Sequence, residues 1–272
     1  MNIEINDAGF EELKKYSQMS ESSLAHIYEP DYGLFIAESP NVIERALRAG
    51  YVPESILVNR EEINEDTKRI LDMCQNVPIY LAPKDILISI TGFQMHRGLL
   101  CAMKRKPLPD PQIMCRDMKR IAVLEGVVNP TNIGAIIRSA AALNIEAVLL
   151  SPDCADPLYR RAARVSMGTV FQVPWTYVCK SRSEWDKDGM DIIRKMGFTT
   201  VAMALLEDSI PINDSRIKSH EKLAIVLGTE GDGLALNTIE KSDYTAIIPM
   251  ANGVDSLNVA AASAVMFWEI SH

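Results

Sequence analysis

The amino-acid sequence predicts an α/β protein in which a parallel β-sheet is the main structural element. Three stretches share one pattern, in which a short run of β-branched and apolar residues is followed by a polar turn and then by a helix. They are residues 121–144, 223–234 and 245–264. Strands that alternate with helices are typical of a parallel sheet, and the loops at the carboxyl ends of its strands converge on one crevice. We therefore expect the three loops to form one ligand site.

The N-terminal part of the chain predicts a small α/β unit. Residues 5–28 are polar and weakly helical, and a regular alternation of elements begins after them. Ser39 is a candidate N-cap with Pro40 at the first helical position, and Gly50 is expected to end that helix. Hydrophobic periodicity predicts the remaining elements. The expected strands are 34–37, 55–58, 77–81 and 98–103, and the expected helices are 40–49, 62–75 and 83–90.

A proline-rich segment separates this unit from the rest of the chain. Residues 106–111 read Lys-Pro-Leu-Pro-Asp-Pro, and prolines in alternation favour a semi-rigid, extended linker. A chain of 272 residues, 47% of them apolar, has enough material for two cores. We therefore predict two domains, residues 1–107 and residues 118–272.

The second domain contains the three stretches among further elements that alternate in the same way. Residues 121–126 predict a strand, and Asn132 soon opens an Ala-rich helix that carries Arg138 in its second turn. Residues 223–227 predict a strand that runs into the glycine-rich loop at 228–234. The other expected elements are strands at 147–150, 171–177, 198–203 and 244–248, helices at 182–196 and 256–270, and a loop at 206–221.

The third stretch, around residues 248–263, is the one on which the domain is centred. Residues 245–248 predict the end of a buried strand, and Pro249 prevents further pairing on its N–H side. The pair Asn252-Gly253 predicts a turn with positive φ. Asp255 or Ser256 is the candidate cap of the last helix. Taken alone, this pattern also fits an ordinary strand–turn–helix junction that binds nothing.

The charge and the cysteine content limit the classes of protein to which this chain can belong. The net charge of −8 argues mildly against nucleic acid as a partner. The basic residues nevertheless cluster at 96–97, 104–106, 116–120 and 160–164, and these clusters fit either solvated surface or an RNA-facing patch. Five scattered cysteines lack metal-ligand spacing, so we expect no metal site and reduced thiols in a cytoplasmic protein. No segment predicts a secretory signal or a membrane span.

Together the three stretches resemble the three motifs of the SpoU/TrmH family of RNA 2′-O-ribose methyltransferases, which belongs to the SPOUT superfamily. Each motif is weakly specific by itself, but all three occur in order and at the family's spacing over most of residues 120–270. Leu143-Asn144 stands where the family commonly has an aromatic residue and Gly, and Asn can take the same left-handed cap. The matching residues are Asn132-Ile-Gly-Ala-Ile-Ile-Arg138-Ser-Ala, then Gly228-Thr-Glu230-Gly-Asp-Gly-Leu, then Ile248-Pro-Met and Ser256-Leu-Asn258-Val.

The N-terminal unit resembles, less specifically, the small substrate-binding domain of many family members, which is akin to RNA-binding ribosomal proteins. The matching segments begin at Leu34 and Gln94. The resemblance implies ribosomal or transfer RNA as a partner and a homodimer formed through the C-terminal domain. The apolar faces of the Ala-rich helix and of the last helix also favour a dimer. Arg97 stands where glutamine is common, so the choice of RNA cannot be transferred.

The resemblance implies S-adenosylmethionine as the cofactor. In the family the cofactor lies bent in loops that form a deep trefoil knot, and main-chain groups hold it. Carried over to this chain, Gly228, Ile248 and Leu257 would contact the cofactor through their backbone, with Met250 nearby. Glycine suits this role because close backbone approach leaves no room for a Cβ atom. The glycine-rich loop is not a G-x-G-x-x-G fingerprint, so the ordinary dinucleotide-binding fold is not supported.

The resemblance also implies an activity, the transfer of a methyl group to a ribose 2′-hydroxyl of structured RNA. Arg138 is the matched catalytic residue, either as a general base or as a clamp on the adjacent phosphate. A guanidinium pKa above about 12 favours the clamp. Glu230 would orient Arg138, while Asn132, Ser256 and Asn258 would place the ribose and brace the loops. Helix capping is the alternative role of Asn132 and Ser256.

Two other functions stay open at this point. A non-catalytic RNA-binding protein could retain the same fold, although the presence of all the matched polar residues argues against it. A small-molecule nucleotide enzyme would turn over without RNA. The sequence names neither the RNA nor the modified position.

Overall fold

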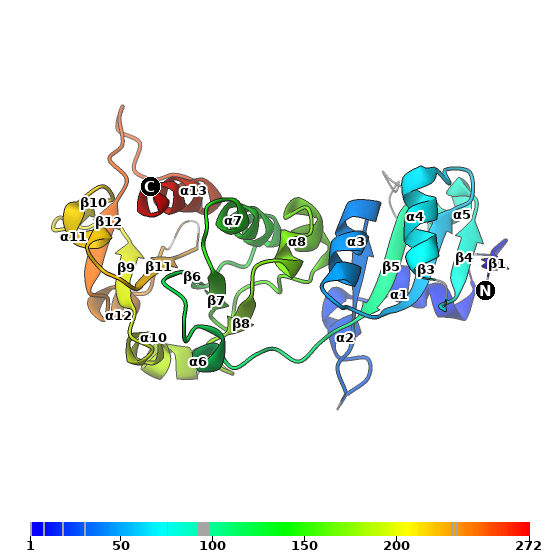
Figure 1. The fold of residues 1–272 in the computed structure, drawn as a ribbon, viewed down its shortest axis with the longest axis horizontal. Coiled ribbons are helices and arrows are strands. Elements are labelled where there is room, and N and C mark those ends of the chain that lie inside the picture. The colour runs from blue at the N-terminus through cyan, green and yellow to red at the C-terminus, as the bar shows by residue number, and fades with distance from the viewer. Residues whose placement is uncertain are drawn as a thin grey trace. The chain divides into compact units, whose positions relative to one another are not determined.

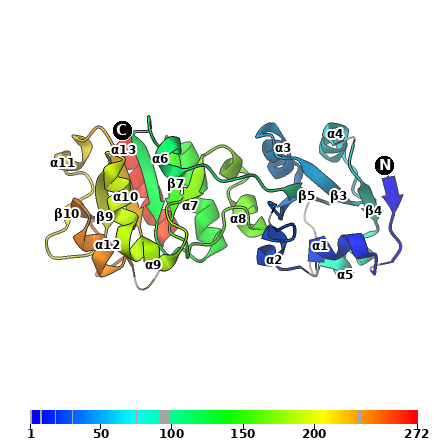
Figure 2. The ribbon, with the colours of Figure 1, turned by 90° about the horizontal axis from the view of Figure 1, so that it is seen from below.

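The computed structural model describes residues 2–7, 9–17, 19–29, 31–74, 76–91, 98–229, 231 and 233–272, without the side chains of Ser17 and Ile90. The chain forms two compact units (Figures 1 and 2). Unit 1 contains Met1–Pro107 and Leu158–Phe171, and unit 2 contains Leu108–Pro157 and Gln172–His272. The first division falls in the proline-rich linker. The segment Leu158–Phe171 was predicted to lie in the second domain, residues 118–272, but it belongs to unit 1.

In the described part of the chain, unit 1 is built on a mixed five-stranded sheet in the order β1-β4-β3-β5-β2. Its strands are β1 (Asn2–Glu4), β2 (Leu34–Glu38), β3 (Pro53–Asn59), β4 (Ile79–Ala82) and β5 (Leu99–Lys104). β4 runs parallel to β1 and β3, whereas β5 runs antiparallel to both of its neighbours. The four strands predicted here are confirmed, and β1 is an additional one.

The helices of unit 1 follow the predicted alternation, with one correction at a helix start. Pro40 begins the first predicted helix, but Ser39 makes no capping hydrogen bond. Its backbone has a φ of 87°, whereas a capping side chain needs the β region to reach the first turn. The cap predicted at Ser39 is therefore wrong. The helices are η1 (Glu11–Leu13), α1 (Lys14–Ser17), α2 (Glu21–Ala25), α3 (Pro40–Arg48), α4 (Glu65–Met73), α5 (Lys84–Thr91), α8 (Arg160–Val165) and η2 (Thr169–Phe171).

The segment Leu158–Phe171 joins unit 1 through an ion pair and an aromatic contact. The carboxylate of Glu38 is 4% exposed and lies 3.2 Å from the Nη1 of Arg164 on α8. The ring of Phe171 lies 5.7 Å from the ring of Phe35, measured between centroids. Hydrophobic periodicity carries no information about such contacts, because the partners are far apart in the sequence.

As far as the structure describes the chain, unit 2 is built on a seven-stranded sheet in the order β10-β12-β9-β11-β6-β7-β8. All its pairs are parallel, which confirms the prediction. Leu124 at the end of β6 pairs with Leu227 at the end of β11, so the loops after these strands start side by side. The strands are β6 (Arg120–Leu124), β7 (Ala147–Leu150), β8 (Trp175–Tyr177), β9 (Thr199–Met203), β10 (Ile210–Pro211), β11 (Leu223–Leu227) and β12 (Tyr244–Ile247).

The helices of unit 2 are α6 (Pro111–Met114), α7 (Pro130–Ala142), α9 (Arg182–Glu184), α10 (Met190–Lys195), α11 (Ser215–Lys218), α12 (Leu236–Glu240) and α13 (Val259–Ser271), with a π-helical turn at Trp185–Gly189. α7 and α13 pack against each other on one face of the sheet (Figure 1). The region 206–221, predicted to be a loop, contains β10 and α11, which are too short to leave a periodic pattern. No described helix is long and apolar enough to cross a membrane.

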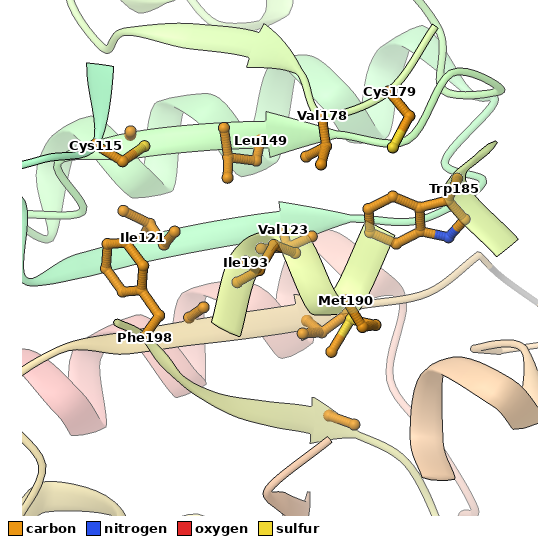
Figure 3. Packing of buried hydrophobic residues seen from close by; sticks show 14 of the residues in the cluster. Cys115, Ile121, Val123, Leu149, Val178, Cys179, Trp185, Met190, Ile193 and Phe198 are labelled. Carbon is orange, nitrogen blue, oxygen red and sulfur yellow. The ribbon is translucent and has the colours of Figure 1, made fainter. Parts of the chain in front are cut away.

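One hydrophobic core of unit 2 lies between the sheet and the helical stretch 182–195 (Figure 3). Val123 of β6 and Leu149 of β7 are fully buried together with Ile193, and Trp185 and Met190 are 2% exposed. Burying a large apolar side chain stabilises a fold by about 1.5–3 kcal/mol. This packing holds β6, and therefore the strand end from which the first motif begins.

Candidate functional site

A cleft of about 750 Å³ opens in unit 2 at the carboxyl end of the parallel sheet. Its walls come from the loops after β9, β11 and β12, which are neighbouring strands. Parallel pairing places these loops at one edge. Two of the three loops predicted to meet, those of the second and third motifs, therefore line one cleft. The loop of the first motif is not part of the described wall.

The described wall of the cleft contains all four residues predicted to contact a cofactor, and two of the polar residues predicted to act beside them. It contains neither Asn132 nor Arg138. The residues in common between the prediction and the wall are Gly228, Ile248, Met250, Ser256, Leu257 and Asn258.

Gly228 is required by the turn that it opens. A Cβ atom at this position would lie 2.4 Å from the carbonyl carbon of Gly233 and 2.6 Å from the nitrogen of Leu234. The N–H of Thr229 donates to the carbonyl oxygen of Gly233 over 3.2 Å, which closes the turn. The reason for Gly228 expected from the sequence is the close approach of a ligand. In the structure, the close return of the loop's own backbone already excludes any side chain there.

A hydrogen bond joins the first and third motifs. The Nδ2 of Asn258 donates to the Oδ1 of Asn132 over 3.3 Å. Asn132 is 7% exposed and lies near the start of α7, whereas Asn258 directly precedes α13. The bond therefore ties the N-terminal ends of two helices that pack along each other.

The helix caps differ from those that the sequence predicts. Asn258 caps α13, because its Oδ1 accepts a first-turn N–H at 2.9 Å, so the caps predicted at Asp255 or Ser256 are wrong. Asn129 caps α7 in the same way, also at 2.9 Å, so Asn132 is not a cap. In both cases the cap is the last extended residue before the chain becomes helical.

Arg138 lies in the middle of α7 with an exposed side chain. Its guanidinium makes no hydrogen bond or ion pair with any residue that the structure describes. Glu230, predicted to orient it, lies outside the described residues, so this pairing stays a prediction. Arg138 therefore offers a charged donor to an incoming anion.

The cleft has little charge of its own. Among its described lining residues, Asp255 carries the one ionisable side chain, and most of the others are aliphatic residues or glycine. No group of three or more His, Cys, Asp or Glu side chains in the described ranges is placed to hold a metal ion. The cleft therefore suits an organic ligand with apolar parts, whose polar groups pair with backbone N–H and C=O groups.

Two features of the site were not predicted from the sequence. Leu205 and Leu206, which follow β9, line the cleft although they are 64% and 41% exposed. They reach it because β9 lies between β11 and β12, and strand order is not readable from periodicity. The capping role of Asn129 could have been found, since an Asn-Pro pair before a helical run is a recognised start signal.

The fold and the cleft define a class of protein: α/β proteins whose organic ligand lies in loops at the carboxyl ends of parallel strands. Residues 119–268 match the model of the SpoU rRNA Methylase family. The matched region contains the three motifs and the residues described above as lining the cleft. The chain belongs to this family.

Relatives with assigned names are similar over most of the chain. An uncharacterized tRNA/rRNA methyltransferase of Mycobacterium bovis is 35% identical over 87% of this chain and 80% of its own length. The 23S rRNA (guanosine-2′-O-)-methyltransferase RlmB of Escherichia coli K12 is 29% identical over 79% of this chain and 87% of its own length. Both similarities cover more of the chain than the family match does.

Solved structures have the same fold. The SpoU methyltransferase AviRb from Streptomyces viridochromogenes, in complex with the cofactor AdoMet, is 26% identical and covers 88% of this chain and 89% of its own, with a TM-score of 0.73. An AdoMet-bound rRNA methyltransferase from Sinorhizobium meliloti is 20% identical and covers 99% of this chain and 97% of its own, with a TM-score of 0.80. The second likeness concerns the fold alone.

Asn258→Ala should lower the free energy of unfolding by about 0.5–2 kcal/mol, because it removes the N-cap of α13. Asn258→Asp keeps an acceptor for the first turn and loses only the Nδ2 donor to Asn132, so it should retain most of the stability. Urea unfolding of both variants measures the difference. An equal loss for Asn258→Asp and Asn258→Ala would show that the bond to Asn132, which both variants lack, and not the cap, is what matters.

Proposed function

We propose that this protein is an S-adenosylmethionine-dependent methyltransferase that acts on a ribose 2′-hydroxyl of structured RNA, ribosomal or transfer RNA. The observation that carries the proposal is the cleft, whose wall contains all four residues predicted to hold the cofactor. The relatives support it, since RlmB is named a 23S rRNA (guanosine-2′-O-)-methyltransferase and the mycobacterial protein an uncharacterized tRNA/rRNA methyltransferase.

The cleft fits S-adenosylmethionine in size and chemistry. Its volume of about 750 Å³ lies within the usual range for small-molecule sites, roughly 300–1,000 Å³. Met250 and Leu257 would offer apolar surface, and the backbone at Gly228 and Ile248 would pair with polar groups. When bound, S-adenosylmethionine supplies a methyl group on a positively charged sulfur, which becomes a neutral thioether on transfer.

Arg138 would act on the acceptor. A ribose hydroxyl is a weak nucleophile, and its proton leaves to solvent as the oxygen takes the methyl carbon. The exposed guanidinium would bind the neighbouring phosphate and stabilise the negative charge that develops on the 2′-oxygen. Glu230 would orient Arg138, and Asn132, Ser256 and Asn258 would place the ribose and brace the loops.

Two further properties are part of the proposal, the first implied by the family resemblance and the second by the cysteines. The first is a trefoil knot, which would involve the loops after β11 and β12 in the cleft wall. The second is a reducing, cytoplasmic setting. All five cysteines are free and buried, and burial raises the pKa of Cys74 and Cys154 to about 11, which makes these thiols poorly reactive.

Transfer of a labelled methyl group to RNA tests the activity against its rivals. A ribose methyltransferase should label RNA and leave alkali-resistant linkages at the modified positions. A non-catalytic RNA-binding protein that retains the fold should bind RNA but show no S-adenosylmethionine binding in calorimetry, with or without RNA. A small-molecule nucleotide enzyme should turn over in the absence of RNA.

Arg138→Ala should slow methyl transfer about a hundred- to a thousandfold, because it removes one charge-stabilising donor. The affinity for S-adenosylmethionine should not change, since Arg138 is not among the described lining residues of the cleft. Single-turnover rates at saturating RNA and calorimetry measure the two quantities. Arg216→Ala, which breaks an exposed ion pair with Asp214 in the same unit, is the control. Lost cofactor binding with an intact rate at saturating cofactor would disprove the acceptor role.

Arg97→Ala combined with Lys104→Ala should weaken RNA binding and flatten its salt dependence, by about one unit of slope for each lost phosphate contact. Lys104 ends β5 with an exposed side chain, whereas Arg97 lies outside the described residues. The rate of transfer to bound RNA should change little. Filter binding over a salt series measures the slope, with Lys68→Ala, from an exposed pair with Glu65, as the control. An unchanged slope would exclude these residues as phosphate contacts.

We infer that the protein forms a homodimer through α7 and α13. Val265 and Trp268 of α13 are 40% and 56% exposed, and exposed apolar side chains in a group mark interaction surfaces. Trp268→Glu should therefore convert a dimer into a monomer in light scattering. Ile113→Glu, which alters a side chain of α6 that is 68% exposed, should leave the dimer intact. A wild-type monomer at micromolar concentration would contradict the inference.

A further inference from the structure

The loop between β6 and α7, residues 125–129, leads directly into the helix that carries Asn132 and Arg138. Glu125 begins this loop and is 3% exposed. Its N–H donates to the carbonyl oxygen of Leu227 over 2.9 Å, so Glu125 lies beside the end of β11. A carboxylate buried at this position needs hydrogen-bond partners, because burial of an unpaired charge is strongly unfavourable.

Arg182 holds one oxygen of this carboxylate. Its guanidinium lies 2.9 Å from the Oε1 of Glu125, 2.7 Å from the Oδ2 of Asp153 and 2.8 Å from the Oδ1 of Asp186. Burial disfavours the charged form of Arg182, but Asp153 and Glu125 outweigh it and raise the pKa of the guanidinium above its ordinary value. Arg182 therefore stays charged and connects the loops after β6 and β7 to the helical stretch 182–195.

Two buried polar atoms lack partners near this ion pair. The Oε2 of Glu125 and the Nε1 of Trp185 are buried and make no hydrogen bond with any described residue. One is an acceptor and the other is a donor. Elsewhere in the described ranges, every buried side-chain nitrogen or oxygen of a non-exposed residue has a partner. A buried indole N–H usually has a hydrogen-bond partner as well. The unpaired donor of Trp185 and the unpaired acceptor of Glu125 therefore complement each other.

The fold brings these two groups into the same part of unit 2. Trp185 follows Arg182 by three residues in one helical stretch, a spacing that makes side chains neighbours. The indole ring packs with Val123 near the carboxyl end of β6, the strand that Glu125 follows (Figure 3). Gly189 leaves room for the ring, since a Cβ atom there would lie 2.5 Å from it.

We propose that Arg182 and Trp185 form a clamp on Glu125, in which the indole N–H donates to Oε2 through one buried water, and that this clamp positions the first motif for methyl transfer. The inference rests on the proposed function. Arg182, Trp185 and Glu125 are positioning residues, because none of them lines the cleft.

Further hydrogen bonds connect the clamp to the loop that precedes α7. The N–H of Gly126 donates to the Oγ of Ser151 over 3.0 Å, and Ser151 donates in turn to Asp153, which Arg182 holds. The carbonyl oxygen of Val127 accepts from the N–H of Ala155 over 2.9 Å. A shift of Glu125 would therefore shift the start of α7, and with it the acceptor-side residues that α7 carries.

Nuclear magnetic resonance of isotope-labelled tryptophan indoles tests the hydrogen bond. Trp185→Phe identifies the resonance of Trp185 among the three tryptophans of the chain. The wild-type indole N–H should exchange slowly with solvent. Glu125→Gln should move its proton resonance upfield, because a neutral amide oxygen is a weaker acceptor than a carboxylate. Arg216→Lys, the control, should leave it unchanged. A resonance that Glu125→Gln does not move would overturn the clamp.

Single-turnover methyl transfer tests the positioning role. Glu125→Gln should slow transfer about ten- to a hundredfold, the scale on which small misplacements act, while the Kd for S-adenosylmethionine stays within about twofold. The double variant Glu125→Gln with Trp185→Phe should be little slower than the slower single variant, because Glu125→Gln weakens and Trp185→Phe removes the same contact. Arg182→Lys, which keeps the charge, should restore part of the rate lost in Arg182→Met. Effects of Glu125→Gln and Trp185→Phe that multiply would overturn the clamp.

Two further measurements distinguish a failure of the inference from the misfolding of a variant and from a failure of the proposed function. Amide exchange over residues 126–134 should be faster in Glu125→Gln than in the wild type, while exchange in α13 stays the same; equal rates over 126–134 would overturn the positioning role. Should Glu125→Gln fail to fold, Trp185→Phe, which keeps the aromatic ring, supports the same exchange test. A wild-type protein that methylates no RNA would disprove the proposed function, whereas the resonance and exchange data would still decide the clamp.

Discussion

The parallel register of β6 and β11 is the constraint on which the rest of unit 2 depends. Leu124 lies opposite Leu227, and the N–H of Glu125 extends the pairing by one more hydrogen bond to Leu227. Parallel strands end at the same edge of a sheet, so the first two motifs start side by side although they are far apart in the chain. Gly228 then begins a turn that returns onto its own backbone. The cleft and the start of α7 both take their positions from this edge.

The residues that line the cleft are different from the arginines that bind or can bind charged groups. The described cleft wall is mostly aliphatic side chain and backbone, which selects a ligand by shape and main-chain hydrogen bonds. Two arginines outside the wall have opposite environments. Arg182 directs its donors to three carboxylates of its own chain, whereas Arg138 is exposed and has no partner among the described residues. The net charge of −8 therefore says little about RNA, since the local arrangement of charge decides which anions can approach.

Predictions of backbone conformation from single residues were correct at positions where the residue type favours one conformation. Asn144 and Asn252 have φ values of 56° and 58°, as expected of a left-handed cap and a turn. The same reasoning failed at Ser39, whose φ of 87° keeps its side chain from capping the helix that starts at the next residue. It also failed at Ser256, because the chain becomes helical only after Asn258. It also left β10 and α11 undetected, since two- and four-residue elements carry no period.

The sequence by itself determined the parallel α/β class, the alternation of elements and the residues of the second and third motifs that line the cleft. The class and the alternation follow from hydrophobic period, and the lining residues follow from the resemblance of short motifs to those of the SpoU/TrmH family. Both are properties of neighbouring residues. The tertiary structure alone decided that the loop after β9 completes the cleft, that Asn258 bonds to Asn132, that Leu158–Phe171 belongs to unit 1, and that Arg182 lies against Glu125. Each of these joins residues that are distant in the chain, and the order of strands in the sheet, which no local pattern encodes, brings them together.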